Sequence, residues 1–597
     1  MAFDAQFSDI IWMVRYFRML TNAVLAGTLA GVYVAIVFLQ INPHLPLDVR
    51  VLWPLLAVVV GFYAVHAATL FYTLIVLRQV MSAELLSPGW LSLRLLSWLS
   101  AAAAAGAALL MWLNLQGLRT ALAEEVARRL GVGAVAMGLC ALALLAIAVV
   151  HYSFGRRGSV VGASLYALAV IASVVLPIAA RGQGLPRPLA AYSSEGAPQS
   201  LRPVGSSRVV MLLLDGASLD YLSLATGDGR LPNFGRLLDS GAAMHLATLR
   251  PTQPGPVWAT VATGQYPPRH GVISASTYQV GSRLAPLELL PDHCFAQALV
   301  YLGFLEEAPA SSAALRSRPL WSVLSGQGVP VGVVGWPLTH PVKPVRGFVV
   351  SDQFHLMADP RFDPSAAQAA YPEEVVTIGA AAMRAVSGGS VLNTVGADGE
   401  GASAPPAEAA PIWRDRVYGR IADDLRKRFP EVRLLTVRYR GLDLAGHQFL
   451  PTVTPIPFLG LGDVRGDASS LGEYYRQVDT EVGTILDFLG PDDLLLVVSG
   501  FGMEPVSVPK RLLARIVGDP DATGTHEAAP DGFILAYGTH VEPGRRTRGS
   551  VVDVAPTVLY YLGVPVARDV DGVARTDIFT AAFTETRPII FVPSYEG

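Results

Sequence analysis

The sequence has little cysteine, little charge and no excess of basic residues. Its 597 residues include only two cysteines, and Cys140 falls inside an apolar run far from Cys294. This distribution argues against a disulfide framework, and no cysteine pattern typical of a zinc site is present. Charged residues make up 16% of the chain, against about a quarter in typical soluble proteins. The net charge of −3 gives no support for nucleic-acid binding, so we expect no nucleic-acid partner.

Long apolar runs in the first third of the chain account for the scarcity of charge. Five of them reach the ~20 residues that a bilayer-spanning helix needs, and several have no polar face, which is typical of membrane helices. They cover roughly 20–41, 51–77, 95–115, 132–152 and 160–180. We therefore predict a helical transmembrane bundle of about five spans over residues 1–181, with the lipid bilayer as its partner.

The orientation of this bundle is open at the level of sequence. Five spans place the N-terminus and the C-terminal part on opposite sides of the membrane. The loops on the two sides carry equal numbers of arginines, so the positive-inside rule does not decide between the two orientations.

The rest of the chain has the pattern of an α/β domain. Residues 182–207 are rich in Gly, Pro and Ser and predict a linker. From 208 to 597, short apolar runs alternate with helical patterns, which indicates a mostly parallel sheet flanked by helices. Residues 387–411 are low in complexity, and we interpret them as a surface insertion.

Several polar residues stand where predicted strands or helices end or begin. Asp215 follows the apolar run of "VVMLLLDGAS", where a buried charge requires a partner such as a metal. Asp443 and His447 lie four residues apart in "RGLDLAGHQF", so on a helix they share one face and can bind the same ion. His526 stands just before a predicted strand in "GTHEAAPDGFILAYG". Each feature alone is common in structural roles.

The order of these phrases resembles the alkaline phosphatase superfamily, in particular its type I phosphodiesterase and nucleotide pyrophosphatase branch. The resemblance extends over about 208–575 and includes "LPNFGRLLDSGA", "PVWATVATGQYPPRHGV" and "VVDVAPTVLYYLGVPVARDVDG". It implies an alkaline-phosphatase-like α/β fold. It also implies a centre of two metals, usually zinc, that clamp a phosphoryl group.

The resemblance assigns metal-site roles to particular residues. Asp443, His447 and His526 match the first metal site, and all three are present. The second site matches Asp215 and an Asp-His pair within the family phrase "SDHG", which in this chain reads "SGFG".

The chain departs from the family pattern at three positions of that second site. Gly500 and Phe501 replace the Asp-His pair, and Pro254 stands where the family has its Ser or Thr nucleophile. Glycine and phenylalanine offer no metal ligand, and proline cannot form a phospho-enzyme intermediate. We therefore expect one divalent metal, zinc being the expected ion, and no second metal. Thr252 is a weaker alternative as a displaced nucleophile.

These features predict a membrane-anchored member of the superfamily with a degenerate second metal site. Its expected role is binding or assembly in the cell envelope, as a pseudoenzyme. One alternative is a one-metal phosphoester hydrolase or transferase acting on lipid-linked or nucleotide phosphodiesters, and another is a transporter or channel component. Besides the bilayer, the expected partners of the protein are a phosphate-containing or lipid-linked ligand and other membrane proteins.

The layout of the chain bears on its location. Five spans followed by a domain of this superfamily resemble lipoteichoic acid synthases and lipid A phosphoethanolamine transferases, in layout only. We therefore expect an integral protein of a bacterial-type inner or plasma membrane, with the domain facing outward into the periplasm or the extracellular space.

Overall fold

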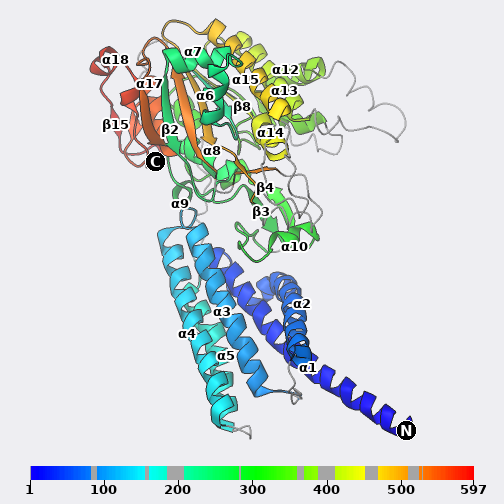
Figure 1. Ribbon diagram of the computed structural model, residues 1–597. Helices are drawn as coiled ribbons and strands as arrows, with labels where there is room; N and C mark the ends of the chain where they lie inside the picture. The colour runs from blue at the N-terminus through cyan, green and yellow to red at the C-terminus, as the bar shows by residue number, and fades with distance from the viewer. Residues whose placement is uncertain are drawn as a thin grey trace. The chain divides into compact units, whose positions relative to one another are not determined.

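The chain folds into two compact units. The structure is a computed structural model that describes residues 2–81, 90–154, 160–184, 207–281, 284–358, 369–386, 410–450, 468–507, 523–526 and 529–596. One unit comprises Met1–Leu189 and Ser276–Pro309, and the other comprises Ala190–Ala275 and Ala310–Gly597 (Figure 1). Most of the predicted linker 182–207 and of the predicted insertion 387–411 lies outside the described residues.

Five helices of the first unit are long and apolar enough to cross a membrane, counted over the described residues. This agrees with the number of spans predicted from the sequence. Many of their large apolar side chains are exposed on the outside of the helices, as expected of side chains that face lipid. The helices are α1 (Ala2–Ile41), α2 (Val49–Met81), α3 (Leu93–Gly117), α4 (Glu124–Phe154) and α5 (Val160–Arg181).

Two glycines allow α1 and α2 to approach closely. A Cβ atom added to Gly27 would lie 2.6 Å from the backbone nitrogen of Ala68, and one added to Gly31 would lie 2.6 Å from the carbonyl oxygen of Val60. Gly27 and Gly31 are four residues apart on one face of α1. Small residues at this spacing are typical of membrane helices whose backbones pack against each other.

Arg181 at the end of α5 binds the end of α1. Its Nε donates to the carbonyl oxygen of Leu39 at 2.6 Å, and its Nη2 donates to those of Asn42 at 3.1 Å and Leu45 at 2.6 Å. These carbonyl groups lie at and beyond the C-terminus of α1, where a helix leaves its last carbonyls unpaired and favours positive charge. The buried guanidinium therefore joins the first and last spans.

A segment from within the predicted phosphodiesterase-type domain belongs to the first unit. Ser276–Pro309 contains β3 (Ser276–Gln279), α10 (Gln297–Tyr301) and β4 (Glu306–Pro309). Asn42 accepts from the backbone N–H of Leu289 at 3.1 Å and donates to its carbonyl at 2.9 Å. Asn114 on α3 makes the same pair of bonds with the backbone of Asp292, at 2.8 and 3.1 Å. The boundaries predicted from sequence, 1–181, 182–207 and 208–597, do not anticipate this attachment.

The second unit is built on a nine-stranded sheet, counted over the described residues. The neighbouring strands β9, β1, β8, β5 and β6 run parallel, and antiparallel pairs join β12 to β2 and β9, and β7 to β6. The predicted α/β class with a mostly parallel sheet is confirmed. The order is β13 (Arg546–Ser550), β2 (Ala242–Ala247), β12 (Asp531–Tyr537), β9 (Leu494–Phe501), β1 (Val209–Leu214), β8 (Leu434–Tyr439), β5 (Val331–Val334), β6 (Gly347–Val350), β7 (Ala370–Tyr371).

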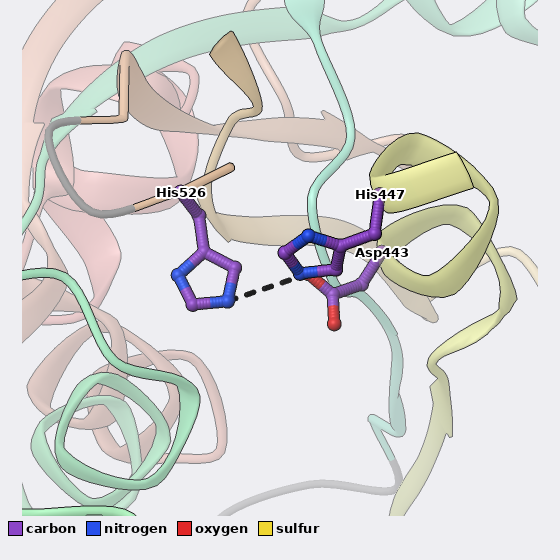
Figure 2. A group of neighbouring side chains, drawn as sticks. All are labelled: Asp443, His447 and His526. Atoms are coloured by element: carbon purple, nitrogen blue, oxygen red, sulfur yellow. Dashed lines mark ion pairs between the residues drawn. The ribbon is translucent and has the colours of Figure 1, made fainter. Parts of the chain in front are cut away.

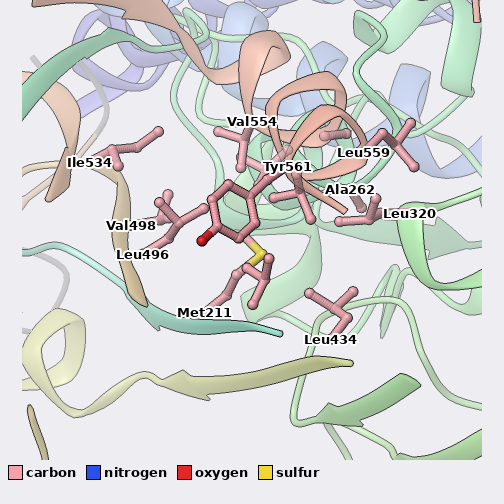
Figure 3. Close-up of a cluster of buried hydrophobic side chains, with 14 of the residues drawn as sticks. Met211, Ala262, Leu320, Leu434, Leu496, Val498, Ile534, Val554, Leu559 and Tyr561 are labelled. Carbon is pink, nitrogen blue, oxygen red and sulfur yellow. The ribbon is translucent and has the colours of Figure 1, made fainter. Parts of the chain in front are cut away.

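Helices cover both faces of this sheet, which explains why its central strands are continuously apolar. On β1, Met211 and Leu213 face one core and Val210 and Leu212 face the other. The first core includes α8 (Pro254–Thr263) and α17 (Val554–Tyr561), with Tyr561 packed near Met211 (Figure 3). The second includes α13 (Ala410–Arg428) and α15 (Ala468–Phe488). The carboxyl ends of β1, β8 and β9 consequently meet at one edge of the sheet.

The close packing of α1 on α2 gives a matched test. Gly31→Ala should lower the thermal stability of the full-length protein in detergent, because the new methyl group meets the backbone of Val60; overpacking of this kind costs about 1–3 kcal/mol. Gly61→Ala is the control, since a Cβ atom there has no neighbour within 4 Å. Equal melting temperatures for the two variants would contradict the packing described for α1 and α2.

Candidate metal centre

The helix that follows β8 carries two of the predicted metal ligands. This helix, α14 (Gly441–Phe449), presents Asp443 in its first turn and His447 in its last turn. Asp415 on α13 holds its N-terminus, because the carboxylate accepts from the backbone N–H of Arg440 at 2.9 Å and of Gly441 at 2.7 Å. A carboxylate at this place satisfies unpaired N–H groups and the positive end of the helix dipole. Burial nevertheless raises the pKa of Asp415 to about 7.

The third predicted ligand comes from a distant part of the sequence. His526 directly follows β11 (Gly524–Thr525), which passes close to α14. A Cβ atom on Gly524 would lie 2.2 Å from the carbonyl oxygen of Gly446, so the approach depends on glycine at this position. Figure 2 shows the imidazole of His526 pointing toward the side chains of Asp443 and His447.

The three side chains converge on one point. Nε2 of His447 lies 3.7 Å from Oδ1 of Asp443, and Nε2 of His526 lies 3.8 Å from the same oxygen. The other ring nitrogens bond to backbone carbonyls: Nδ1 of His447 to Gly524 at 2.8 Å and Nδ1 of His526 to Thr252 at 3.1 Å. Because a carbonyl oxygen only accepts, these bonds require the proton on Nδ1, and in a neutral ring Nε2 then offers its lone pair to a cation.

This donor set fits a divalent cation. Oδ1 of Asp443 is buried and accepts no hydrogen bond from the residues that the structure describes. One ligand atom from each of the three residues can be chosen so that all lie within 4.8 Å of one another. Tetrahedral zinc with bonds of about 2.0–2.1 Å places its ligand atoms roughly 3.3 Å apart, so only a small movement is needed. Burial and the nearby Asp215 raise the pKa of Asp443, and a cation offsets both effects.

Asp215, the predicted remnant of the second metal site, is bound to an arginine. Its Oδ1 accepts from Nε of Arg438 at 3.0 Å and from Nε1 of Trp258 at 2.8 Å, and its Oδ2 accepts from Nη2 of Arg438. The two members of this ion pair are buried, with side-chain exposures of 0% for Asp215 and 6% for Arg438. A bidentate guanidinium occupies both oxygens that a metal would use.

The two substituted positions on β9 are part of the packed interior. Phe501 is fully buried, and its ring centroid lies 5.2 Å from that of His526. A Cβ atom added to Gly500 would lie 2.5 Å from a methyl carbon of Val257. An aspartate at position 500 would therefore require Val257 to move. The neighbourhood of positions 500 and 501 is therefore packed around glycine and phenylalanine.

Position 254, where the resemblance places the nucleophile, has no reactive group. Pro254 is the first residue of α8 and has no side-chain hydroxyl. Thr252 is 1% exposed, and its hydroxyl donates to the carbonyl oxygen of Leu249 at 2.7 Å. The carbonyl of Thr252, not its hydroxyl, contacts His526.

The structure thus brings Asp443, His447 and His526 together and places Asp215 in a separate ion pair. Sequence reasoning missed Arg438 and Asp415. A signal for Arg438 was present, because "LLTVRYRG" places an arginine inside a run of buried strand residues, where a charge requires an acidic partner. No local signal pointed to Asp415, which lies on another helix.

Comparison with known proteins identifies the family of the second unit. The model of the family "Type I phosphodiesterase / nucleotide pyrophosphatase" matches residues 209–551, more than half of the chain. The chain belongs to this family. The match covers the sheet and the residues of the metal centre, and the family is metal-dependent. Among curated proteins, none matches the chain.

Metal binding tests the centre directly. The full-length phosphodiesterase-family protein, stripped of metal and titrated with zinc, should bind about one ion per chain, and His526→Ala should abolish this binding by removing one of three ligands. His245→Ala is the matched control, because His245 on β2 is exposed and outside the centre. Calorimetry and elemental analysis measure the stoichiometry. Undiminished binding by His526→Ala would contradict the assignment of the ligands.

Proposed function

We propose that this membrane-anchored protein of the phosphodiesterase family binds a phosphate-ester ligand at a one-cation centre and does not cleave it by the family's two-metal route. The observation that carries this proposal is the bidentate pair between Arg438 and Asp215. The two-metal route uses a second cation to stabilise the attacking and leaving oxygens of a displacement. Here a fixed guanidinium neutralises Asp215, and its donors are directed at that carboxylate.

The surroundings of the triad suit an anionic ligand. A bound cation would supply a Lewis-acidic attachment point for a phosphoryl oxygen. Arg440 lies beside the triad. Its Nε is 3.8 Å from Oδ2 of Asp443, and its side chain is 40% exposed. Burial, together with the charges of Arg438 and Arg414, lowers the pKa of Arg440. A ligand with negative charge would relieve the repulsion among these guanidinium groups.

A one-metal hydrolase or transferase is the second candidate. The side chains of His447 and His526 are 35% and 18% exposed, so a ligand or water molecule can reach the ion that they would hold. This supports an open fourth position, as in catalytic zinc sites. By contrast, the described residues of α1–α5 offer no observation that favours the transporter alternative; the buried Arg181 is bonded to backbone carbonyls.

We further propose zinc as the ion, and a bacterial-type inner or plasma membrane with the domain facing outward. The ligand would be lipid-linked, and the role would be binding or assembly in the cell envelope with other membrane proteins. The support is the layout of five candidate spans joined to a phosphodiesterase-family domain. A membrane anchor keeps such a domain near lipid-linked phosphates.

Binding without turnover is the expected behaviour. The zinc-loaded full-length protein should bind bis(4-nitrophenyl) phosphate in calorimetry, His526→Ala should lose this binding, and His245→Ala should keep it. Release of 4-nitrophenolate should equal that in buffer, because the two-metal clamp and the hydroxyl nucleophile are missing. Zinc-dependent release that His526→Ala abolishes would contradict the binding role and favour the one-metal hydrolase.

The role of Arg438 as a built-in cation gives a separate prediction. Arg438→Ala leaves a buried carboxylate without its partner, which typically costs about 3–5 kcal/mol. Zinc should then raise the melting temperature of this variant more than that of the wild type, since Asp215 becomes available as a ligand. In the double variant Arg438→Ala/Asp215→Asn the additional zinc effect should disappear. A zinc response of the single variant equal to that of the wild type would contradict the role given to Arg438.

A further inference from the structure

The segment Ser276–Pro309 presents an apolar patch at its surface. Four large side chains around α10 are mostly exposed: Phe295 (67%), Tyr301 (75%), Leu302 (57%) and Phe304 (49%). No Asp, Glu, Lys or Arg occurs between residues 294 and 305, whereas Asp292 precedes this stretch and two glutamates follow it. Several exposed apolar side chains within so short a segment point to a surface that binds a protein or a membrane.

The patch is held firmly by its own unit. Cys294 and Leu299 are buried beneath it, and the hydroxyl of Tyr63 on α2 donates to the carbonyl oxygen of Cys294 at 2.9 Å. Phe304 lies against α2, with its ring centroid 6.3 Å from that of Phe62. The exposed side chains therefore sit at a fixed place beside a membrane helix.

The patch continues the lipid-facing surface of α2. This helix is a candidate span, and only 17% of an apolar 18-residue window within it is buried. Its large apolar side chains are exposed on both sides of Phe62 and Tyr63 along the helix, as Trp53 (65%) and Val65 (65%) illustrate. Apolar surface extends from α2 to Phe304 through the contact of Phe304 with Phe62. Aromatic residues such as Trp53 and Tyr301 are typical of the membrane–water interface.

We propose that residues 295–304 lie in the interfacial layer of the bilayer, with Phe295, Tyr301, Leu302 and Phe304 in contact with lipid. The occupant of the patch is the membrane that surrounds α2, because the patch and the lipid-facing side of α2 form one apolar surface. A short uncharged stretch that ends at acidic residues suits shallow insertion, in which the charges stay in water. The phosphodiesterase-family chain then contacts the bilayer through a segment inserted within the family domain, in addition to its five spans.

Spin-label accessibility in proteoliposomes tests this placement with the full-length protein. Nitroxides are attached to single introduced cysteines, Tyr301→Cys and Leu302→Cys. Leu142→Cys, exposed on the candidate span α4, is the lipid control, and Glu307→Cys, exposed on β4, is the water control. The wild type corrects for any labelling of its two buried cysteines. All four substitutions are at exposed positions, and size-exclusion elution as for the wild type verifies folding.

The labels at 301 and 302 should be accessible to oxygen, like the label at 142. They should be much less accessible to a water-soluble nickel complex than the label at 307. Labels at 301 and 302 that match 307 in both measurements would overturn the proposal, because the patch would then face water. Protection from both oxygen and nickel would also overturn it, since a protein partner or a second copy of the chain would cover the patch.

Discussion

The carboxylate of Asp215 and the guanidinium of Arg438 are buried against each other at the adjoining ends of β1 and β8, and the character of the whole site depends on this pair. A carboxylate at the end of a buried strand is tolerated only when a cation is close. In a two-metal centre that cation is a metal ion; in this chain it is an arginine on the neighbouring strand. Trp258 donates a further hydrogen bond to the same carboxylate.

In the proposed account, this pair keeps Asp215 apart from the triad, so the two do not form a two-metal centre. On one side, Asp443, His447 and His526 offer oxygen and nitrogen atoms, and backbone carbonyls set the orientation of the two imidazoles. On the other side, Val257 lies where a side chain on Gly500 would be, and Phe501 is packed into the core. Asp215, Arg438 and Gly500 lie at one edge of the sheet, because β1, β8 and β9 run parallel. The chain belongs to the family by the match over residues 209–551, and the proposed change in metal binding involves only a few side chains.

Much of this arrangement was predictable from the sequence. The apolar runs predicted the five long helices, and the alternation of short apolar runs with helical patterns predicted the sheet. The spacing of Asp443 and His447 predicted that they share one face of a helix. The meeting of His526 with them followed only from the resemblance to the family, because no local pattern links residues so far apart.

Other features depend on contacts across the fold. Asp415 caps a helix that lies elsewhere in the sequence, and the attachment of Ser276–Pro309 to α1 and α3 rests on the side chains of Asn42 and Asn114. Periodicity and turn signals describe one segment at a time, so they cannot reveal such partners. Arg438 was also missed, although its sequence carries a signal, since a charge inside a buried strand implies a partner even when its identity is open.

The central claim is that a single cation occupies the triad while Arg438 holds Asp215. Crystals of the zinc-loaded protein, measured at the zinc absorption edge, test it most directly. The account predicts one anomalous peak, within bonding distance of Asp443, His447 and His526, and none at Asp215. Two peaks about 4 Å apart, with Asp215 coordinating the second, would contradict it.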